Sequence, residues 1–357
     1  MADPDFGRLR TALLGGQPDR VPLAELKVED EVKSAFLGQR AADPADREAW
    51  VRQAIEFALA AGYDYVRLPV PVSYPQPTHA REHSYGVGGG SRRREWAETH
   101  QGLVTTEQEF ERFPWPRAGQ ADYRDLEIAA RLLPPGMGLI SSVKGGGIFE
   151  RVWMLMGFES FCLALRDQPA LVARMFSRLG ELYYQVWQRL AAFPGMGALW
   201  LGDDLGYSEA LLVAPQLYRQ HLFPWYRLLA EVCRRHDLPF IYHSCGRLWE
   251  VIPELLAAGI NALHPIEPKA MDIREVKARY GRQLCLMGNI DLGYTLTRGT
   301  PAEVEAQVRQ RIREIAPGGG YCLGSSNSVT EYVPVENFRA MVEAGRRWGG
   351  YPISPQV

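Results

Sequence analysis

One imidazole and two thiols occupy positions suited to metal binding. His243 and Cys245 closely follow the apolar run at residues 238–241, and Cys322 follows a second short apolar stretch much later in the chain. One nitrogen and two sulfur ligands suit zinc. Three protein ligands leave a fourth position for a further ligand or a substrate, the usual arrangement of a catalytic zinc. The pattern therefore predicts a zinc site at His243, Cys245 and Cys322.

The alternative is that these cysteines are only small apolar residues, because an isolated cysteine is most often buried in a core. Cys162, Cys233 and Cys285 fit that interpretation, since they lie inside apparent helices or strands. His243, Cys245 and Cys322 differ because a short apolar strand runs into a small-residue turn at each segment. Functional groups gather at such positions in α/β barrels.

Further polar residues stand where other predicted strands end. They are Lys27, Lys144, Asp203, Asp204, Glu267, Asn289 and Asp291. The carboxyl ends of parallel strands meet at one face of a barrel, so these side chains are expected near the zinc ligands. For Lys27 and Lys144 the favoured interpretation is that of loop residues in solvent.

Four of these residues are candidate catalytic residues: Asp203, Asp204, Asn289 and Asp291. The adjacent carboxylates of Asp203 and Asp204 follow an apolar run, where a pair of solvent-facing acids is less expected. One of them is either a fourth zinc ligand or the acceptor that orients His243. A helix cap is an equally good interpretation of Asp291.

Short apolar runs alternate with helical patterns along most of the chain. This alternation predicts a parallel (β/α)8 TIM barrel that occupies residues 1–357 as a single domain. The expected strands are residues 21–26, 65–70, 138–143, 198–201, 240–242, 262–263, 284–287 and 321–323.

Three helices have clear sequence signals. Residues 47–61 carry apolar side chains at helical spacing and stop at Gly62, and residues 169–192 form a second long helical region. Residues 301–315 begin with Thr300 as the N-cap, followed by Pro301 and Glu303 in the first turn. Residues from about 71 to 116 interrupt the alternation of expected strands and helices. They predict an insertion after the second strand, with a β-hairpin as one possibility.

Composition excludes several classes of protein. The formal net charge is −2, so the composition does not indicate a nucleic-acid-binding surface. The hydrophobic fraction of 46% is enough for one large core. No apolar run is long enough to cross a bilayer, and the N-terminal residues show no secretion signal. The five cysteines have no disulfide-framework spacing. We therefore expect a cytoplasmic protein without membrane or nucleic-acid partners.

Four stretches resemble the uroporphyrinogen decarboxylase superfamily, and within it the zinc-dependent corrinoid methyltransferases. They are residues 202–206, 243–246, 288–291 and 319–322, the last followed by 334–337. Their order and spacing agree over roughly residues 140–345. The His-x-Cys pair with a distant cysteine resembles the zinc signature of methylcobalamin:coenzyme M methyltransferases.

The resemblance implies a (β/α)8 barrel with a funnel-like site and zinc held by His243, Cys245 and Cys322. It also implies methyl transfer between a corrinoid, carried as methylcobalamin or by a partner corrinoid protein, and a zinc-activated thiol or related small molecule. A zinc-bound thiol is deprotonated and therefore nucleophilic. Demethylation of a methylated small molecule uses similar parts.

One departure argues against decarboxylation of uroporphyrinogen. Decarboxylases of the superfamily carry an arginine-rich motif near the N-terminus, where this chain has Glu25 and Lys27. A substrate with eight carboxylates needs dense positive charge. We keep a cofactor-independent decarboxylase of the same fold as the alternative function, because such an enzyme would not need zinc. A non-enzymatic zinc barrel remains a third possibility, which a fourth protein ligand would favour.

Overall fold

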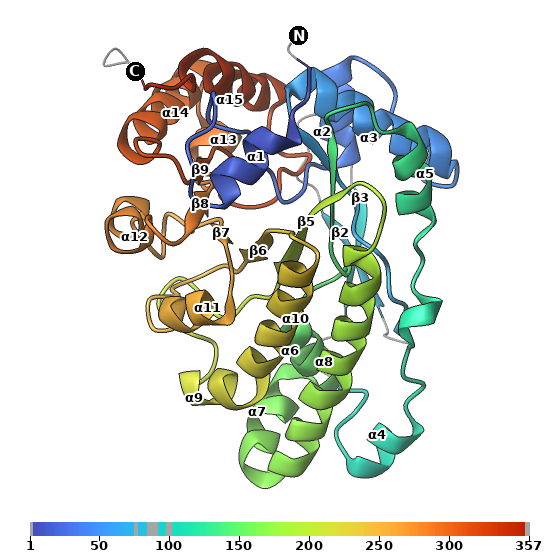
Figure 1. The fold of residues 1–357 in the computed structure, drawn as a ribbon. Helices are drawn as coiled ribbons and strands as arrows, with labels where there is room; N and C mark the ends of the chain where they lie inside the picture. Colours follow the sequence, from blue (N-terminus) through green and yellow to red (C-terminus); the bar gives the residue numbers. More distant parts are fainter. Residues whose placement is uncertain (1–2, 75–77, 84–91, 98–101, 354–357) are drawn as a thin grey trace.

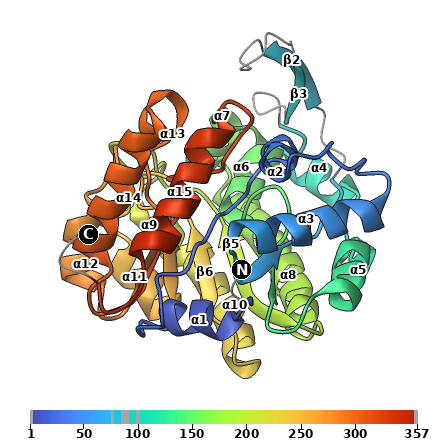
Figure 2. The same cartoon turned by 90° about the horizontal axis from the view of Figure 1, so that it is seen from above.

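The computed structural model describes residues 3–74, 78–83, 92–97 and 102–353. Seven parallel strands form one curled sheet, and helices surround it on its outer side (Figures 1 and 2). The strands pair in chain order and are β1 (Tyr65–Arg67), β4 (Gly138–Ser141), β5 (Met196–Gly202), β6 (Phe240–His243), β7 (Ala262–His264), β8 (Cys285–Met287) and β9 (Tyr321–Cys322).

The segment expected to be the first strand joins the sheet through isolated bridges. Leu23 pairs with Leu323 and Val28 pairs with Val329, both in parallel orientation. The described residues show no ladder between this segment and β1. Parallel α/β architecture is thus confirmed, while the complete eight-stranded barrel stays a prediction.

Helices cover the sheet and connect its strands. In the first half of the chain they are α1 (Phe6–Leu13), α2 (Asp30–Leu37), α3 (Arg47–Ala61), α4 (Glu107–Arg112), the 3₁₀ helix η1 (Ala118–Gln120), α5 (Arg124–Leu132), α6 (Ile148–Met156), α7 (Phe158–Asp167) and α8 (Pro169–Ala191). In the second half they are α9 (Pro215–Leu217), the π-helical turn η2 (Tyr218–Leu222), α10 (Phe223–Arg235), α11 (Ile252–Ala258), α12 (Ile273–Tyr280), α13 (Thr295–Arg298), α14 (Pro301–Ile315) and α15 (Val335–Trp348).

The three helices with clear sequence signals are confirmed. Helix α3 ends at Gly62, whose φ of 85° favours glycine because other residues are strained there. Helix α14 begins with a capping box in which Thr300 and Glu303 each accept a hydrogen bond from the other's backbone N–H. Local capping chemistry therefore fixes these ends without help from the core.

The predicted insertion at residues 71–116 falls partly outside the described residues. Within it, β2 (Thr78–His83) and β3 (Arg92–Ala97) pair in antiparallel orientation. Figure 2 shows this pair projecting from the body of the molecule. Whether the whole span is an insertion stays a prediction. No helix among the described residues is both long and apolar enough to cross a membrane.

Candidate metal centre

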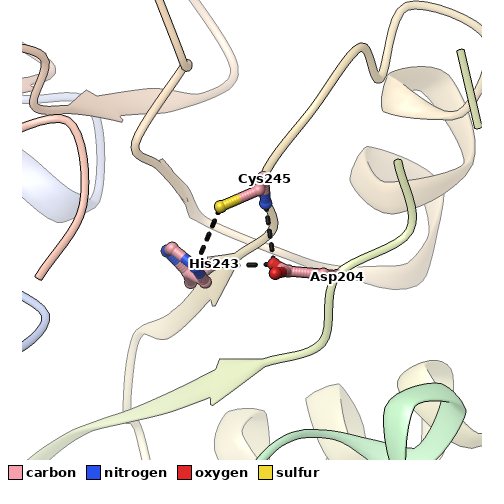
Figure 3. A group of neighbouring side chains, drawn as sticks. All are labelled: Asp204, His243 and Cys245. Carbon is pink, nitrogen blue, oxygen red and sulfur yellow. Dashed lines mark hydrogen bonds and ion pairs between the residues drawn. The ribbon is translucent and has the colours of Figure 1, made fainter. Parts of the chain in front are cut away.

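Two neighbouring strands bring three ligand side chains together. His243 is the last residue of β6, Cys245 follows it by two positions, and Asp204 lies two positions after β5. Gly202 and His243 are paired in the ladder, so both strands end at the same level. Figure 3 shows the three side chains converging from these two strand ends. Of the residues that the sequence placed at strand ends, the structure thus brings His243, Cys245 and Asp204 together.

The turns after β5 and β6 are held against each other by backbone contacts. The Leu205 N–H donates to the Ser244 hydroxyl oxygen at 2.9 Å. Gly246 has a φ of 91°, and a Cβ at this position would lie 2.3 Å from the carbonyl carbon of Gly206. Only glycine fits such a left-handed position at this close approach. This packing fixes Cys245 relative to Asp204.

The spacing of the donor atoms fits a zinc ion. His243 Nε2 lies 3.5 Å from Asp204 Oδ1 and 3.8 Å from Cys245 Sγ. All three donor atoms lie within 4.8 Å of one another. Tetrahedral zinc with ligand bonds of about 2.0–2.3 Å places its donor atoms roughly 3.3–3.7 Å apart. One thiolate, one imidazole and one carboxylate are also donor types that zinc accepts.

The electrostatics of this group call for a cation. The Cys245 backbone N–H donates to Asp204 Oδ1 at 2.8 Å, and the Gly246 N–H donates to Glu267 Oε2 at 2.9 Å. Burial, followed by the nearby carboxylates of Asp204 and Glu267, raises the pKa of the Cys245 thiol. Among the described residues, no lysine or arginine forms an ion pair with either carboxylate. A divalent cation would offset this concentration of negative charge.

His264 orients the imidazole of His243. Their Nδ1 atoms lie 2.7 Å apart, so one ring must donate a proton to the other. Burial lowers the pKa of both imidazoles, which keeps them neutral at neutral pH. A His243 ring that donates from Nδ1 leaves Nε2 free to bind a metal. We did not predict this role, although His264 ends β7 as His243 ends β6.

Asp203 points away from the metal-binding group and holds helix α6. Its carboxylate accepts hydrogen bonds from the backbone N–H groups of Phe149 and Glu150, both at 2.9 Å, and from the Tyr226 hydroxyl at 2.8 Å. Burial raises its pKa to about 7 despite these donors. Of the two adjacent aspartates, Asp204 is thus placed to contact a metal and Asp203 to anchor the helix that flanks the site.

The structure does not bring Cys322 into the group. Its Sγ lies 3.8 Å from the Sγ of Cys285, and both side chains are fully buried. The parallel pairing continues beyond β9, through Leu323 and then Ser325. Cys322 therefore lies within the strand and below its carboxyl end, unlike His243. No contact among the described residues supports the zinc-ligand role that the sequence predicted for Cys322, and that role would require the thiol to leave Cys285.

Asn289 and Asp291 also lie apart from the group. The Asn289 side chain donates to the Ile266 carbonyl at 2.7 Å and accepts from Arg311 Nε at 2.9 Å. Asp291 accepts from the backbone N–H groups of Gly293 and Tyr294, which makes it a turn cap. Their catalytic roles stay predictions without a contact that supports them.

A cavity of about 1030 Å³ opens beside the candidate metal centre. Its lining includes His243, Asp204 and Glu150, and also Glu25 and Arg67. Burial and the carboxylates of Asp204 and Asp203 raise the pKa of Glu150 to about 8. This volume lies at the upper end of the range typical of small-molecule sites.

Glu25 is a buried carboxyl group held by Ser325. The Ser325 backbone N–H and hydroxyl lie 2.7 and 2.5 Å from its two oxygens. Burial raises the pKa of Glu25 to about 8, so the group is largely neutral at neutral pH. A loop residue close to Ser325, Asn327, donates from Nδ2 to Cys245 Sγ at 3.1 Å. The loop after β9 thus contacts both the cavity wall and the candidate metal centre.

The sequence model of the family described as Uroporphyrinogen decarboxylase (URO-D) matches residues 107–348. The chain therefore belongs to the uroporphyrinogen decarboxylase family. This confirms the resemblance identified in the sequence.

Relatives with two kinds of names match parts of the chain. A methylated-thiol–coenzyme M methyltransferase of Methanosarcina mazei is 29% identical over 190 residues, which cover 53% of this chain and 48% of the relative. A uroporphyrinogen decarboxylase of Trichodesmium erythraeum is 27% identical over 174 residues, which cover 48% and 46%. A methylcobamide:CoM methyltransferase of Methanosarcina barkeri is 26% identical over 133 residues, 37% of each chain. The matches thus span about half the length of these relatives or less.

A solved structure shares the fold over nearly the whole chain. A methyltransferase from Methanosarcina mazei superposes with a TM-score of 0.70 at 17% identity, covering 97% of this chain and 99% of that one. At this identity the superposition establishes the architecture alone. The curled parallel sheet described above is therefore that of a known barrel-like fold.

Asp203 and Asp204 are expected to differ in their effects on the metal-free protein. Asp203→Asn replaces one of two carboxylate oxygens that are both in use, Oδ1 by the Glu150 N–H and Oδ2 by the Phe149 N–H and the Tyr226 hydroxyl, so it should lower the free energy of unfolding by about 1–3 kcal/mol. Asp204→Asn should change it by less than about 0.5 kcal/mol, because the group is partly exposed. Urea unfolding measures both. A larger loss for Asp204→Asn would contradict this division of roles.

The stability contributed by Glu25 should depend on pH. Its folded-state pKa, about 8, lies above its ordinary value of 4.5, so between these values the folded protein keeps a proton that the unfolded chain has lost. Stability should therefore fall as pH rises through this window, by on the order of a few kcal/mol. Glu25→Gln should remove this component, which urea unfolding at about pH 5 and pH 8 would reveal. Identical pH profiles for the parent and Glu25→Gln would refute the assignment.

Proposed function

We propose that the protein is a zinc-dependent methyltransferase that moves a methyl group between a corrinoid and a thiol or related small molecule. The observation that carries the proposal is the convergence of Asp204, His243 and Cys245 beside a cavity of about 1030 Å³. Membership of a family whose relatives include methyltransferases supports it. We also propose that the corrinoid is presented by a partner protein.

Asp204, His243 and Cys245 would hold the metal. When bound, zinc would deprotonate a substrate sulfur and keep it nucleophilic. His264 fixes the orientation of His243, and the Cys245 N–H fixes the carboxylate of Asp204. Asn327 donates to the Cys245 sulfur and so limits how much negative charge that thiolate offers. These contacts hold the donor atoms in place before any substrate enters.

The ligand set bears on the direction of transfer. With Asp204 as the third protein ligand, only one thiolate, that of Cys245, would bind the metal. A carboxylate oxygen is a harder donor than sulfur. The set therefore supports demethylation of a methylated small molecule as well as methylation of a thiol. Both directions need the same cavity and the same corrinoid partner, so the proposal includes both.

The two competing functions have less support. The cavity wall offers little free positive charge for a substrate with eight carboxylates, because Lys27, Lys33 and Arg47 are each paired with carboxylates. A structural zinc site normally has four protein ligands, whereas the group found among the described residues has three. Decarboxylation and a purely structural metal both remain outcomes that the next experiment distinguishes.

Zinc content and methyl transfer should depend on Cys245 and not on Cys322. The parent should hold about one zinc per chain. Cys245→Ala should lose most of it, because a third of the ligand set is gone, while Cys322→Ala serves as the matched control and should retain it. Elemental analysis, followed by demethylation of methylcobalamin with a panel of small thiols, measures both effects.

Three results would change the proposal. Zinc loss in Cys322→Ala would restore Cys322 to the ligand set. Full zinc in a Cys245→Ala, Asp204→Asn double variant would remove the candidate site. Formation of coproporphyrinogen from uroporphyrinogen at enzyme-like rates would favour the decarboxylase. Thermal melting of each variant checks that the fold is intact.

A further inference from the structure

Arg67 is a half-buried cation in the cavity wall, and the described residues offer it no carboxylate partner. It ends β1 and lines the same cavity as His243 and Asp204. Its Nη1 donates to the Leu26 carbonyl at 2.8 Å and its Nη2 donates to the Ser142 hydroxyl at 2.9 Å. Both acceptors are uncharged. Among the described residues no aspartate or glutamate forms an ion pair with this guanidinium.

Arg67 has hydrogen-bonding capacity to spare. A guanidinium has five N–H donors, and the two bonds to Leu26 and Ser142 leave three. The Nε atom is buried and makes no hydrogen bond. The guanidinium also lies over the ring of Trp200, 5.3 Å from its centroid. A buried charge with unused donors is costly unless a ligand or solvent in the cavity satisfies it.

The other cations of the cavity wall do not share this state. Lys27 pairs with Glu29, and Lys33 pairs with Asp30. Arg47 is bonded to both Asp122 and Asp125, and Arg124 pairs with Asp122. Lys144 lines the cavity too, but it is exposed to solvent. Among the described cations of this wall, Arg67 is therefore the one that is shielded from solvent in part, lacks a carboxylate partner and has unused donors.

Glu25, a buried acid in the same cavity wall, does not neutralise Arg67. Glu25 bonds to Ser325, and its raised pKa leaves it largely protonated at neutral pH. Arg67 itself keeps its charge, because burial lowers its pKa only to about 10. Contacts between rings place Arg67 near the candidate metal centre: its guanidinium lies 5.3 Å from the Trp200 centroid, that ring lies 5.3 Å from the ring of His264, and His264 contacts His243.

We propose that Arg67 binds an anionic group, of the carboxylate type, on the small molecule whose sulfur or methyl group reacts at the metal centre. This inference rests on the proposed function, because it names the substrate class of the same site. The planar fork of an arginine suits a carboxylate. A single cation suits a substrate with one anionic group, whereas a porphyrinogen with eight carboxylates would require several cations.

Two thiols of similar size test this assignment. One is 3-mercaptopropionate and the other is the uncharged 3-mercapto-1-propanol. Cobalt(II) replaces zinc, so that sulfur binding at the metal produces thiolate-to-cobalt absorption bands without any turnover. The parent should bind the carboxylate at least about tenfold more tightly than the alcohol, since one charged hydrogen-bonded pair is worth at least that factor.

Three variants separate recognition from folding. Arg67→Gln should reduce the affinity ratio to about one, while Arg67→Lys should retain part of it because the charge remains. Lys144→Gln is the control for any nearby positive charge, and it should keep the ratio of the parent. An unchanged ratio in Arg67→Gln, or a ratio lost in Lys144→Gln, overturns the proposal. A mere loss of stability would weaken the binding of both thiols equally and leave the ratio unchanged, so it too counts against recognition.

Calorimetric titration of the metal-free protein with the same two compounds distinguishes failure of this inference from failure of the proposed function. Binding to the cavity then does not depend on sulfur coordination. An Arg67-dependent preference for the carboxylate without any cobalt bands would keep the anion site and reject thiol binding at the metal. Cobalt bands of equal affinity for both thiols would keep the proposed function and reject the anion site.

Discussion

The arrangement depends on one electrostatic constraint: carboxylate and thiol donors are concentrated at two strand ends, and no lysine or arginine among the described residues forms an ion pair with them. Asp204 and Glu267 both accept backbone hydrogen bonds next to Cys245, and together with burial they raise the pKa of its thiol. In the metal-free state this cluster is unfavourable, because like charges share a poorly solvated space. A bound divalent ion would attract these donor groups and so offset the repulsion between them. The close packing of the turns after β5 and β6 keeps the donors together until an ion binds.

What the sequence predicted well are features that local chemistry determines. Helices α3 and α14 have the expected ends because capping residues and glycine act within one turn of the backbone. His243 and Cys245 were correctly placed together because they flank a single strand end. Seven of the expected strands pair in chain order, since short apolar runs between helices leave little choice in a parallel sheet.

What the sequence could not predict depends on depth along a strand and on contacts between distant segments. Cys322 follows an apolar run just as Cys245 does, yet its strand continues past it and turns its thiol toward Cys285. Asp203 and Asp204 are adjacent in sequence, but their side chains diverge to a helix start and to the metal-binding group. The sequence did contain a signal that could have identified Arg67 as a functional residue, because a charged residue inside an apolar strand needs a partner or a function.

X-ray absorption spectroscopy of the zinc-loaded protein tests the central claim most directly, because it counts the sulfur atoms bound to the metal. The account predicts one sulfur at about 2.3 Å, from Cys245, with the remaining ligands nitrogen or oxygen at about 2.0–2.2 Å. Asp204→Asn should alter only the lighter ligands. Two sulfur ligands in the parent protein would contradict the account, because they would require Cys322 at the metal and would displace Asp204 from the ligand set.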